Sequence, residues 1–349
     1  MEYEKRVRRV VPYVPGEQPT RTDIIKLNTN ENPYPPAPEV ERILHSFGER
    51  TDELRKYPDP TCMTLRKAIA EAYGIGSDQV FVGVGSDDVL AMSFLTFFNS
   101  EDPVLFPDIT YSFYDVWCDL FRIPYETPAL DEDFRIRVED YKRPCGGAVI
   151  ANPNAPTGVE LDMSSLESII AYSGDRVVIV DEAYADFGTI SALSLLDKYE
   201  NLLVVRTMSK SRSLAGSRIG YAIGSPRMIR YLEDVKYSYN SYTMDRITLE
   251  VGAAAMKDEA YFKETVAKIV RTRERLTGEL RNLGFKVYDS ATNFVFARPA
   301  DGDAKGLFER LRGEGIYVRY FDKPRINEWL RISVGTEAEC DRLIAFLKG

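Results

Sequence analysis

The chain of 349 residues is long enough to bury a large core and to form two domains. Its composition, 28% charged and 44% hydrophobic, is that of an ordinary globular protein. The net charge of −9 argues against a nucleic-acid or anionic-membrane partner. No apolar run approaches the roughly 20 residues of a membrane helix, and the N-terminus lacks the apolar core of a signal peptide. We therefore expect a cytoplasmic protein.

Cysteine and histidine are too few for several kinds of site. The four cysteines are scattered with no paired spacing, which predicts reduced thiols and neither a disulfide framework nor a zinc site. The single histidine, His45, lies on a predicted helix (38–48), where a surface or packing role is expected. We predict no metal site, so lysine, tyrosine, carboxylate or a cofactor must move the protons of any reaction.

The first hundred residues begin with an irregular segment. Residues 1–36 are rich in proline and turn formers, which predicts an N-terminal arm that takes its order from another part of the protein. A helix is predicted over 61–74, with Thr61 as its N-cap. Residues 80–88 then predict a short strand that turns through glycines into a helix over 89–98.

Strands and helices alternate through the middle of the chain. Helices are predicted at 111–120 and 164–172. The apolar runs lie at 103–106, 148–151, 177–180, 202–205 and 220–223. Because these runs are continuously apolar and do not alternate with polar residues, they predict strands covered on both faces, in a mostly parallel sheet flanked by helices.

The last hundred residues follow a different rhythm. A long helix at 259–283 precedes short strands and helices, which together predict a compact α+β unit. These later elements are strands at 285–288, 293–297, 316–320 and 329–334, and helices at 304–313 and 337–347. We predict an α/β protein with an arm at 1–36, a large domain at 37–248 and a small C-terminal domain at 249–349.

Polar side chains follow three successive strands of the predicted sheet. Asn154, Asp181 and Lys210 each come just after an apolar run, at the edge where open α/β sheets bind ligands. Singly, Asp181 could cap a helix and Lys210 could be a solvated loop lysine. Together, a lysine amine and a carboxylate able to pair with a protonated pyridine nitrogen suit a covalently bound pyridoxal phosphate.

Groups suited to a phosphate surround this lysine. Thr207, Ser209 and Arg218 supply hydroxyls and a guanidinium, and the turn at 83–87 offers backbone N–H groups at a helix N-terminus. The turn lacks the third glycine of a dinucleotide-binding motif. It could still be a plain tight turn, and a nucleotide-binding domain without catalysis is the alternative from another class.

Six segments carry a resemblance to a known family. Three of them are similar to the fold-type-I pyridoxal-phosphate aminotransferases, namely 152–158, 181–184 and 209–221. Three more narrow the resemblance to the histidinol-phosphate aminotransferase branch, namely 27–36, 55–60 and 330–335. The resemblance covers nearly the whole chain in order. It implies the fold of these enzymes, with a large domain that binds the cofactor.

The resemblance implies a role for each residue around the cofactor ring. Lys210 would hold the cofactor covalently and carry a proton between the substrate α-carbon and the cofactor, while Asp181 would keep the pyridine nitrogen protonated. Tyr184 and Asn154 would hydrogen-bond the phenolic oxygen of the ring. Tyr111 would stack on the ring face, although it could equally belong to an aromatic core.

The resemblance also implies phosphate, partner and substrate contacts. Tyr57 would reach the cofactor phosphate of a second subunit, which implies a homodimer, or it could brace its own turn. Arg331 would bind the α-carboxylate of glutamate or 2-oxoglutarate. Arg319, Tyr13 and Asn30 would contact the substrate, although Arg319 could be a surface residue. The phosphate ligands would be Thr207, Ser209, Arg218 and the backbone of Ser86 and Asp87.

The family pattern and this chain differ at one position of the predicted site. The family places asparagine directly before Pro156, whereas this chain has Ala155. Either Asn154 serves the phenolic oxygen from a shifted position, or that hydrogen bond is weakened. The main prediction is transamination between L-histidinol phosphate and 2-oxoglutarate in histidine biosynthesis. The alternatives keep the cofactor: an aromatic or other amino-acid aminotransferase, or a phosphothreonine decarboxylase.

Overall fold

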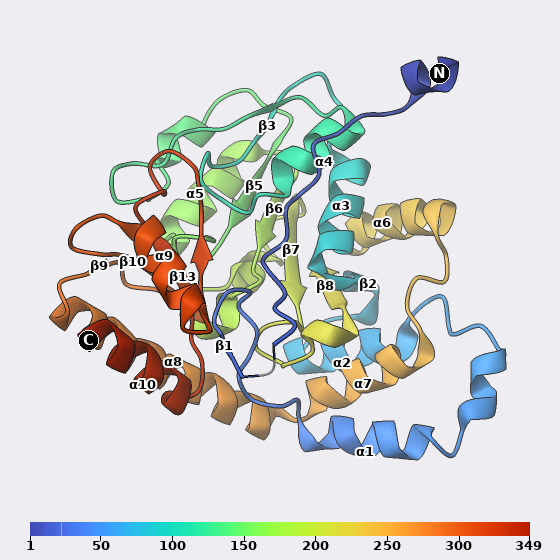
Figure 1. Cartoon of the computed structure of the whole chain (residues 1–349). Coiled ribbons are helices and arrows are strands. Elements are labelled where there is room, and N and C mark those ends of the chain that lie inside the picture. The colour runs from blue at the N-terminus through green and yellow to red at the C-terminus, as the bar shows by residue number, and fades with distance from the viewer. Residues whose placement is uncertain (22) are drawn as a thin grey trace.

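The computed structural model describes residues 1–21 and 23–349. These contain a large and a small β-sheet, both covered by helices, and a separate pair of short strands (Figure 1). The large sheet has seven strands in the order β2-β8-β7-β6-β5-β3-β4. These are β2 (Val80–Val84), β3 (Val104–Leu105), β4 (Tyr125–Glu126), β5 (Gly147–Ala151), β6 (Val178–Asp181), β7 (Leu202–Thr207) and β8 (Ile219–Ile223). β7, β6, β5, β3 and β4 are parallel, and β8 is antiparallel to both of its neighbours. The predicted mostly parallel sheet is confirmed.

Helices cover both faces of the large sheet because its central strands are apolar on both sides. Every residue of β5, β6, β7 and β8 is buried. On one face Val149, Ile179 and Leu203 pack with α3 (Gly85–Phe97), α4 (Tyr114–Phe121) and α6 (Pro226–Tyr239). The opposite face is covered by α1 (Pro38–Phe47), α2 (Met63–Tyr73), α5 (Met163–Ser173) and α7 (Arg246–Lys257).

The small sheet is antiparallel, in the order β12-β13-β10-β9. Its strands are β9 (Lys286–Val287), β10 (Phe294–Arg298), β12 (Arg319–Tyr320) and β13 (Leu330–Ser333). The helices of this part are α8 (Glu259–Asn282), α9 (Ala304–Gly313) and α10 (Glu337–Lys348). α8 runs along the base of the molecule and contacts both the small sheet and the short helix η5 (Ala185–Phe187) of the large part (Figure 1).

Part of the N-terminal arm joins the C-terminal part of the chain. β1 (Ile25–Lys26) pairs in parallel with β11 (Ile316–Tyr317), and Ile25 and the following Leu27 enter the core of the small part. The first residues, with the short helix η1 (Glu2–Arg6), extend away from the body of the protein (Figure 1). The arm therefore has more regular structure than the sequence predicts.

Several element boundaries differ from the predictions. The strand predicted at 316–320 is divided into β11 and β12, which belong to different sheets. The helix predicted from residue 61 begins at Met63, and its first turn is capped from outside by Asp59, which accepts bonds from Thr61 N and Met63 N at 2.9 Å each. The predicted domain boundary at 248/249 falls inside α7, which packs on α1 and α2, so packing favours a later boundary.

Two further observations concern the surface. Among the described residues, no helix is both long and apolar enough to cross a membrane. His45 lies on an exposed face of α1 with its side chain 81% exposed, beside Glu41. The predicted surface role of this histidine is confirmed.

Gly220 lies very close to the backbone of a neighbouring segment, near the cavity described in the next subsection. It pairs with Gly83 across β8 and β2, and a Cβ at residue 220 would overlap the backbone of Gly85 and Ser86, where α3 begins. Backbone cannot move aside as a side-chain end can, so a methyl group here forces the start of α3 away from the sheet.

We expect Gly220→Ala to lower the free energy of unfolding by about 1–3 kcal/mol, because overpacking costs that much in well-packed sites. Gly216→Ala is the matched control, since nothing lies within 4 Å of a Cβ at that position. Thermal melting followed by circular dichroism measures both. Equal melting temperatures for the two variants would contradict the assigned contact.

Candidate active site

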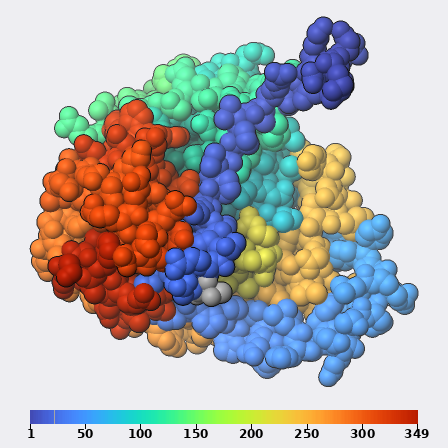
Figure 2. All heavy atoms as spheres, in the orientation of Figure 1, coloured from blue at the N-terminus to red at the C-terminus, as the bar shows by residue number. Residues whose placement is uncertain are grey.

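A cavity of about 280 Å³ lies at the carboxyl ends of β6 and β7. Residues of the N-terminal arm form one wall, and Figure 2 shows this arm lying across the face of the molecule beside the C-terminal part. Every predicted site residue except Tyr57 and Asn154 lines the cavity. Those that do are Tyr13, Asn30, Ser86, Asp87, Tyr111, Asp181, Tyr184, Thr207, Ser209, Lys210, Arg218, Arg319 and Arg331.

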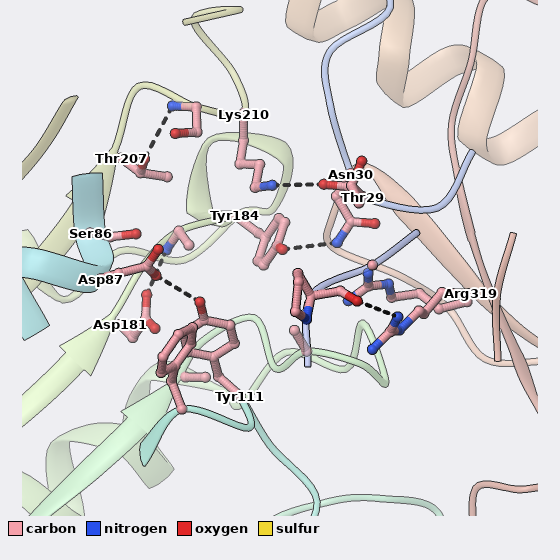
Figure 3. A pocket seen from close by; sticks show the side chains of 18 of the residues that line it. Thr29, Asn30, Ser86, Asp87, Tyr111, Asp181, Tyr184, Thr207, Lys210 and Arg319 are labelled. Carbon is pink, nitrogen blue, oxygen red and sulfur yellow. Dashed lines mark hydrogen bonds between the residues drawn. The ribbon is translucent and has the colours of Figure 1, made fainter. Parts of the chain in front are cut away.

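Lys210 extends into the cavity from the loop after β7 (Figure 3). Its Nζ donates a hydrogen bond of 3.0 Å to the carbonyl of Thr29 and lies 5.9 Å from the centre of the Tyr184 ring. Burial, followed by the charge of Arg331, lowers the pKa of Lys210 to about 8. An amine with this pKa is partly neutral near neutral pH, so it can act as a nucleophile or a base.

Asp181 ends β6 and is also buried. One carboxylate oxygen accepts a bond of 2.7 Å from the Tyr114 hydroxyl, and the other accepts 3.1 Å from the N–H of Ala183. Burial raises the pKa of Asp181 to about 6, although these two donors oppose the rise. Because both donors are neutral, the carboxylate can still pair with a cation on a bound ligand.

An anion cradle lies at the start of α3. Ser86 and Asp87 occupy its first turn, where backbone N–H groups have no acceptor within the helix. Gly85 has φ +80°, and a Cβ there would lie 2.5 Å from Arg218 Nη2, so glycine allows this guanidinium to approach the helix. Arg218 pairs with Asp87 at 3.1 Å, and Thr207 and Ser209 complete the lining.

Two arginines of the small sheet face the cavity. Arg319 on β12 lies directly opposite Arg331 on β13 in the antiparallel register, so two like charges are neighbours. Arg331 donates 3.0 Å to the carbonyl of Asn28, while its buried Nε has no hydrogen-bond partner among the described residues. Arg319 donates to the carbonyls of Val14 and Pro15 at 3.2 and 3.4 Å. This end of the cavity is built for an anion.

Tyrosines form the remaining walls. The Tyr184 hydroxyl accepts 2.9 Å from the side-chain amide of Asn30, so Asn30 holds a predicted site residue in place (Figure 3). Tyr111 lines the cavity, yet its hydroxyl donates 2.6 Å to Asp87 and its ring packs edge-on against Tyr114. Both interpretations of Tyr111, cavity wall and aromatic core, therefore describe part of its position.

Asn154 does not line the cavity in the described structure, and its predicted contact with a ring oxygen stays a prediction. Its side-chain oxygen accepts 2.8 Å from Thr110, and its amide nitrogen donates 3.0 Å to Ile109 O and to Thr157 Oγ1. The loop thus uses the whole side chain, and Ala155 lines the cavity instead. Of the two possibilities at this position, the structure favours the loss of one donor.

Tyr57 also lies away from the cavity of its own chain. Its side chain is among the most exposed of the large apolar residues, at 78%, and its ring stacks on Tyr242 at 4.6 Å. The cavity contact predicted for Tyr57 is therefore not made within one chain.

The comparisons with known proteins settle the family. Residues 22–347 match the model of the family described as aminotransferase class I and II. The chain belongs to this family. It is 49% identical over 348 residues to the histidinol-phosphate aminotransferase of Lactococcus lactis subsp. cremoris (strain MG1363), covering 100% of this chain and 97% of that protein. It is 50% identical over 347 residues to the histidinol-phosphate aminotransferase of Acinetobacter baumannii (strain AB307-0294), covering 99% and 96%.

Solved structures agree with this assignment. The histidinol-phosphate aminotransferase of Sinorhizobium meliloti in complex with pyridoxal-5'-phosphate is 26% identical, with a TM-score of 0.84 over 93% of this chain and 89% of that one. The histidinol-phosphate aminotransferase of Clostridium acetobutylicum has a TM-score of 0.85 at 22% identity, covering 93% and 98%. This second likeness supports the fold, which is that of the fold-type-I aminotransferases.

The cavity of this aminotransferase fits pyridoxal phosphate. Lys210 offers a buried amine of lowered pKa to an aldehyde, and Asp181 offers a buried carboxylate without a cationic donor to a pyridine nitrogen. The first turn of α3 with Arg218 offers donors to a phosphate. These three groups come from separate elements, and all of them line one cavity.

Sequence reasoning missed three contacts of this aminotransferase. Tyr114 is one of several aromatic residues that follow Tyr111, so the sequence does not single it out. Its position at the start of α4 brings its hydroxyl within hydrogen-bond distance of Asp181. Asn32 donates to the carbonyl of Lys210 at 3.0 Å, and Thr29 accepts from the lysine amine. The signal for the last two was present, because both belong to the 27–36 segment that carries the family resemblance.

We expect Tyr114→Phe to shift the pH dependence of cofactor binding. If Asp181 binds the cofactor as an ionised carboxylate, affinity should fall as pH drops through its pKa of about 6. Loss of the hydrogen bond removes a stabiliser of the ionised form, which raises this pKa by about one unit or more. Fluorescence titration of the apoenzyme with pyridoxal phosphate between pH 5 and 8 (about the range in which the group titrates) measures the shift. An unchanged acidic limb would remove Tyr114 from this role.

Proposed function

We propose that this aminotransferase exchanges the amine of L-histidinol phosphate with 2-oxoglutarate, giving imidazole acetol phosphate and L-glutamate, in histidine biosynthesis. The observation that supports this proposal is one cavity lined by Lys210 and Asp181 and by the arginine pair, Arg319 and Arg331. About half of all positions are identical to histidinol-phosphate aminotransferases over the whole chain, which supports the same substrate.

The residues around the cofactor divide the chemistry between them. Pyridoxal phosphate, when bound, supplies an electron sink for the charge that develops on the substrate α-carbon. Asp181, which lines the cavity, would hold the proton on the pyridine nitrogen, and Tyr184, which also lines it, would hydrogen-bond the phenolic oxygen of the ring. Lys210 Nζ would carry the proton between the substrate α-carbon and the aldehyde carbon of the cofactor, a role that suits its pKa of about 8. Arg218, Thr207 and Ser209 with the start of α3 hold the phosphate.

The arginine pair serves two different anionic substrates. Arg331 binds the α-carboxylate of glutamate or 2-oxoglutarate with its free Nε and its Nη groups. Arg319 and Tyr13 face the distal anion, which is a carboxylate in one substrate and a phosphate in the other. Tyr13 stacks on Phe113 at 4.2 Å, so an aromatic surface is available at the same end for an imidazole ring.

A comparison of amine substrates tests the assignment. We expect kcat/KM for L-histidinol phosphate to exceed that for phenylalanine by at least about a hundredfold, because its phosphate offers the arginine pair more negative charge and more acceptor oxygens than the single carboxylate of phenylalanine. Phosphothreonine should give no decarboxylation product. Coupled assay of glutamate formation from 2-oxoglutarate measures the rates. Comparable rates for phenylalanine would reject the narrow assignment and favour an aromatic aminotransferase.

We further propose a homodimer with shared active sites, in which Tyr57 reaches the phosphate site of the partner subunit. In support, Tyr57 is exposed and lies outside its own cavity, and Tyr239, Tyr242 and Leu54 are also exposed large apolar side chains. Exposed apolar side chains of this size are typical of surfaces that bury on assembly. The cytoplasmic location stays a prediction of the sequence.

Mixing two impaired variants tests the sharing of sites. In a hybrid of Lys210→Ala and Tyr57→Ala chains, one site combines an intact Lys210 with an intact Tyr57 from the other chain. After unfolding and refolding at equal amounts, we expect about a quarter of the wild-type activity, since half of the dimers are hybrids with one of two sites intact. If each chain completed its own site, the mixture would be no more active than the separately refolded Tyr57→Ala chain.

A further inference from the structure

Behind the cavity lies a buried network of charged and hydroxyl side chains that the proposed reaction does not use. At its centre Arg206 of β7 donates to Glu182 through Nε at 2.9 Å and Nη2 at 2.6 Å, and to Asp186 through Nη1 at 2.8 Å. The three side chains are 7%, 1% and 21% exposed. Arg206 and Glu182 are thus almost fully removed from water, and Asp186 is mostly buried.

Hydroxyl groups complete the network. Nη1 of Arg206 also donates to Tyr73 at 3.1 Å, and Nη2 donates to Ser191 at 3.0 Å. All five N–H donors of the guanidinium are therefore used. The second oxygen of Asp186 accepts a bond of 2.5 Å from the Ser211 hydroxyl. Such complete satisfaction fixes the geometry of every member.

Each of four members stands next to a cavity residue but does not itself line the cavity. Glu182 follows Asp181 in the chain, Arg206 precedes Thr207, and Ser211 follows Lys210. Asp186 lies in η5, two residues after Tyr184. The network therefore joins two chain segments, 181–186 with the carboxylate and the phenol and 206–211 with the amine.

We propose that Ser211 is a positioning residue, which transmits the geometry of the Arg206–Glu182–Asp186 network to the main chain of Lys210; this proposal rests on the proposed function. The carbonyls of Lys210 and Ser211 are held independently by the side-chain amide of Asn32, at 3.0 and 3.2 Å. The Ser211 hydroxyl fixes the same loop through Asp186. Two sets of hydrogen bonds thus fix the main chain from which the Lys210 side chain extends.

Stability alone is a weak reason for such a network. Buried ion pairs lose much of their attraction to desolvation, and apolar replacements of similar volume are often as stable. Precise placement of a reacting atom is a stronger reason for the network, because a displacement of about 1 Å at such an atom can slow a reaction about a hundredfold. The hydrogen bond from Ser211 to Asp186 links the network to the main chain beside Lys210.

The test measures covalent attachment of pyridoxal phosphate to the apoenzyme, in which Lys210 Nζ forms a C=N bond with the aldehyde carbon and one water leaves. Stopped-flow absorbance gives the rate without any amine substrate. We expect Ser211→Ala to attach the cofactor about tenfold more slowly and Ser211→Thr to restore the rate. Ser191→Ala is the matched control, because it removes a hydroxyl from the same network on the Glu182 side. We expect less than about a twofold change there.

A second variant separates positioning from a general loss of packing. Asp186→Ala breaks the same link from the acceptor side, and the double variant with Ser211→Ala should be no slower than the slower single variant. If Ser211→Ala does not fold, Asp186→Ala against Ser191→Ala carries the comparison. Equal slowing in Ser211→Ala and Ser191→Ala, no slowing in either, or multiplying effects in the double variant would overturn the proposal. A wild-type protein that attaches no pyridoxal phosphate would instead overturn the proposed function.

Discussion

The burial of two opposite charges at the ends of neighbouring strands is the constraint on which the site depends. Asp181 ends β6 and Lys210 follows β7, and both are removed from water because the strands that carry them are apolar on both faces. Burial moves the pKa of the carboxyl up to about 6 and that of the amine down to about 8. The same sheet that provides the core therefore brings both groups into the range where they exchange protons near neutral pH.

The N-terminal arm stabilises this arrangement and does more than cover it. Thr29 accepts from the Lys210 amine, Asn30 donates to Tyr184, and Asn28 accepts from Arg331. These contacts reach both the large sheet and the small one from one short segment, and β1 fixes that segment to β11. An arm bonded to the amine, the phenol and an arginine is part of the catalytic geometry, so the sequence there is constrained by the site as much as by the fold.

The sequence predicts what depends on local pattern and misses what depends on side-chain direction. Continuous apolar runs identified the buried strands, and the position just after each run identified Asp181 and Lys210. Asn154 follows the same rule, yet its side chain does not line the cavity, because Thr110 and Ile109, more than forty positions earlier in the chain, use its amide. No pattern in the 152–158 segment contains that information.

Tyr114 and Arg206 are residues whose roles the sequence did not predict, again because side-chain direction decides them. Tyr114 reads as one aromatic residue among several, and the rotation of α4 alone aims its hydroxyl at Asp181. Arg206 stands as one charge within the apolar strand β7, and only the fold reveals that Glu182 and Asp186 enclose it. A single charge in a buried run is nevertheless a usable signal, since it must be paired somewhere.

The arginine pair, the proposed site for substrate anions, comes from a different part of the chain than Lys210, although all three residues line one cavity. Two guanidinium groups held side by side on β12 and β13 repel each other, and in the described structure backbone carbonyls and aromatic rings offset that repulsion. Carbonyl groups carry partial charges, so an anionic ligand can replace them with a net gain in attraction. Chemistry at Lys210 is common to any amine that fits, whereas the sheet of the C-terminal part and the arm decide which anion binds. Specificity therefore follows from the packing of the arm against β12, and catalysis follows from the edge of the large sheet.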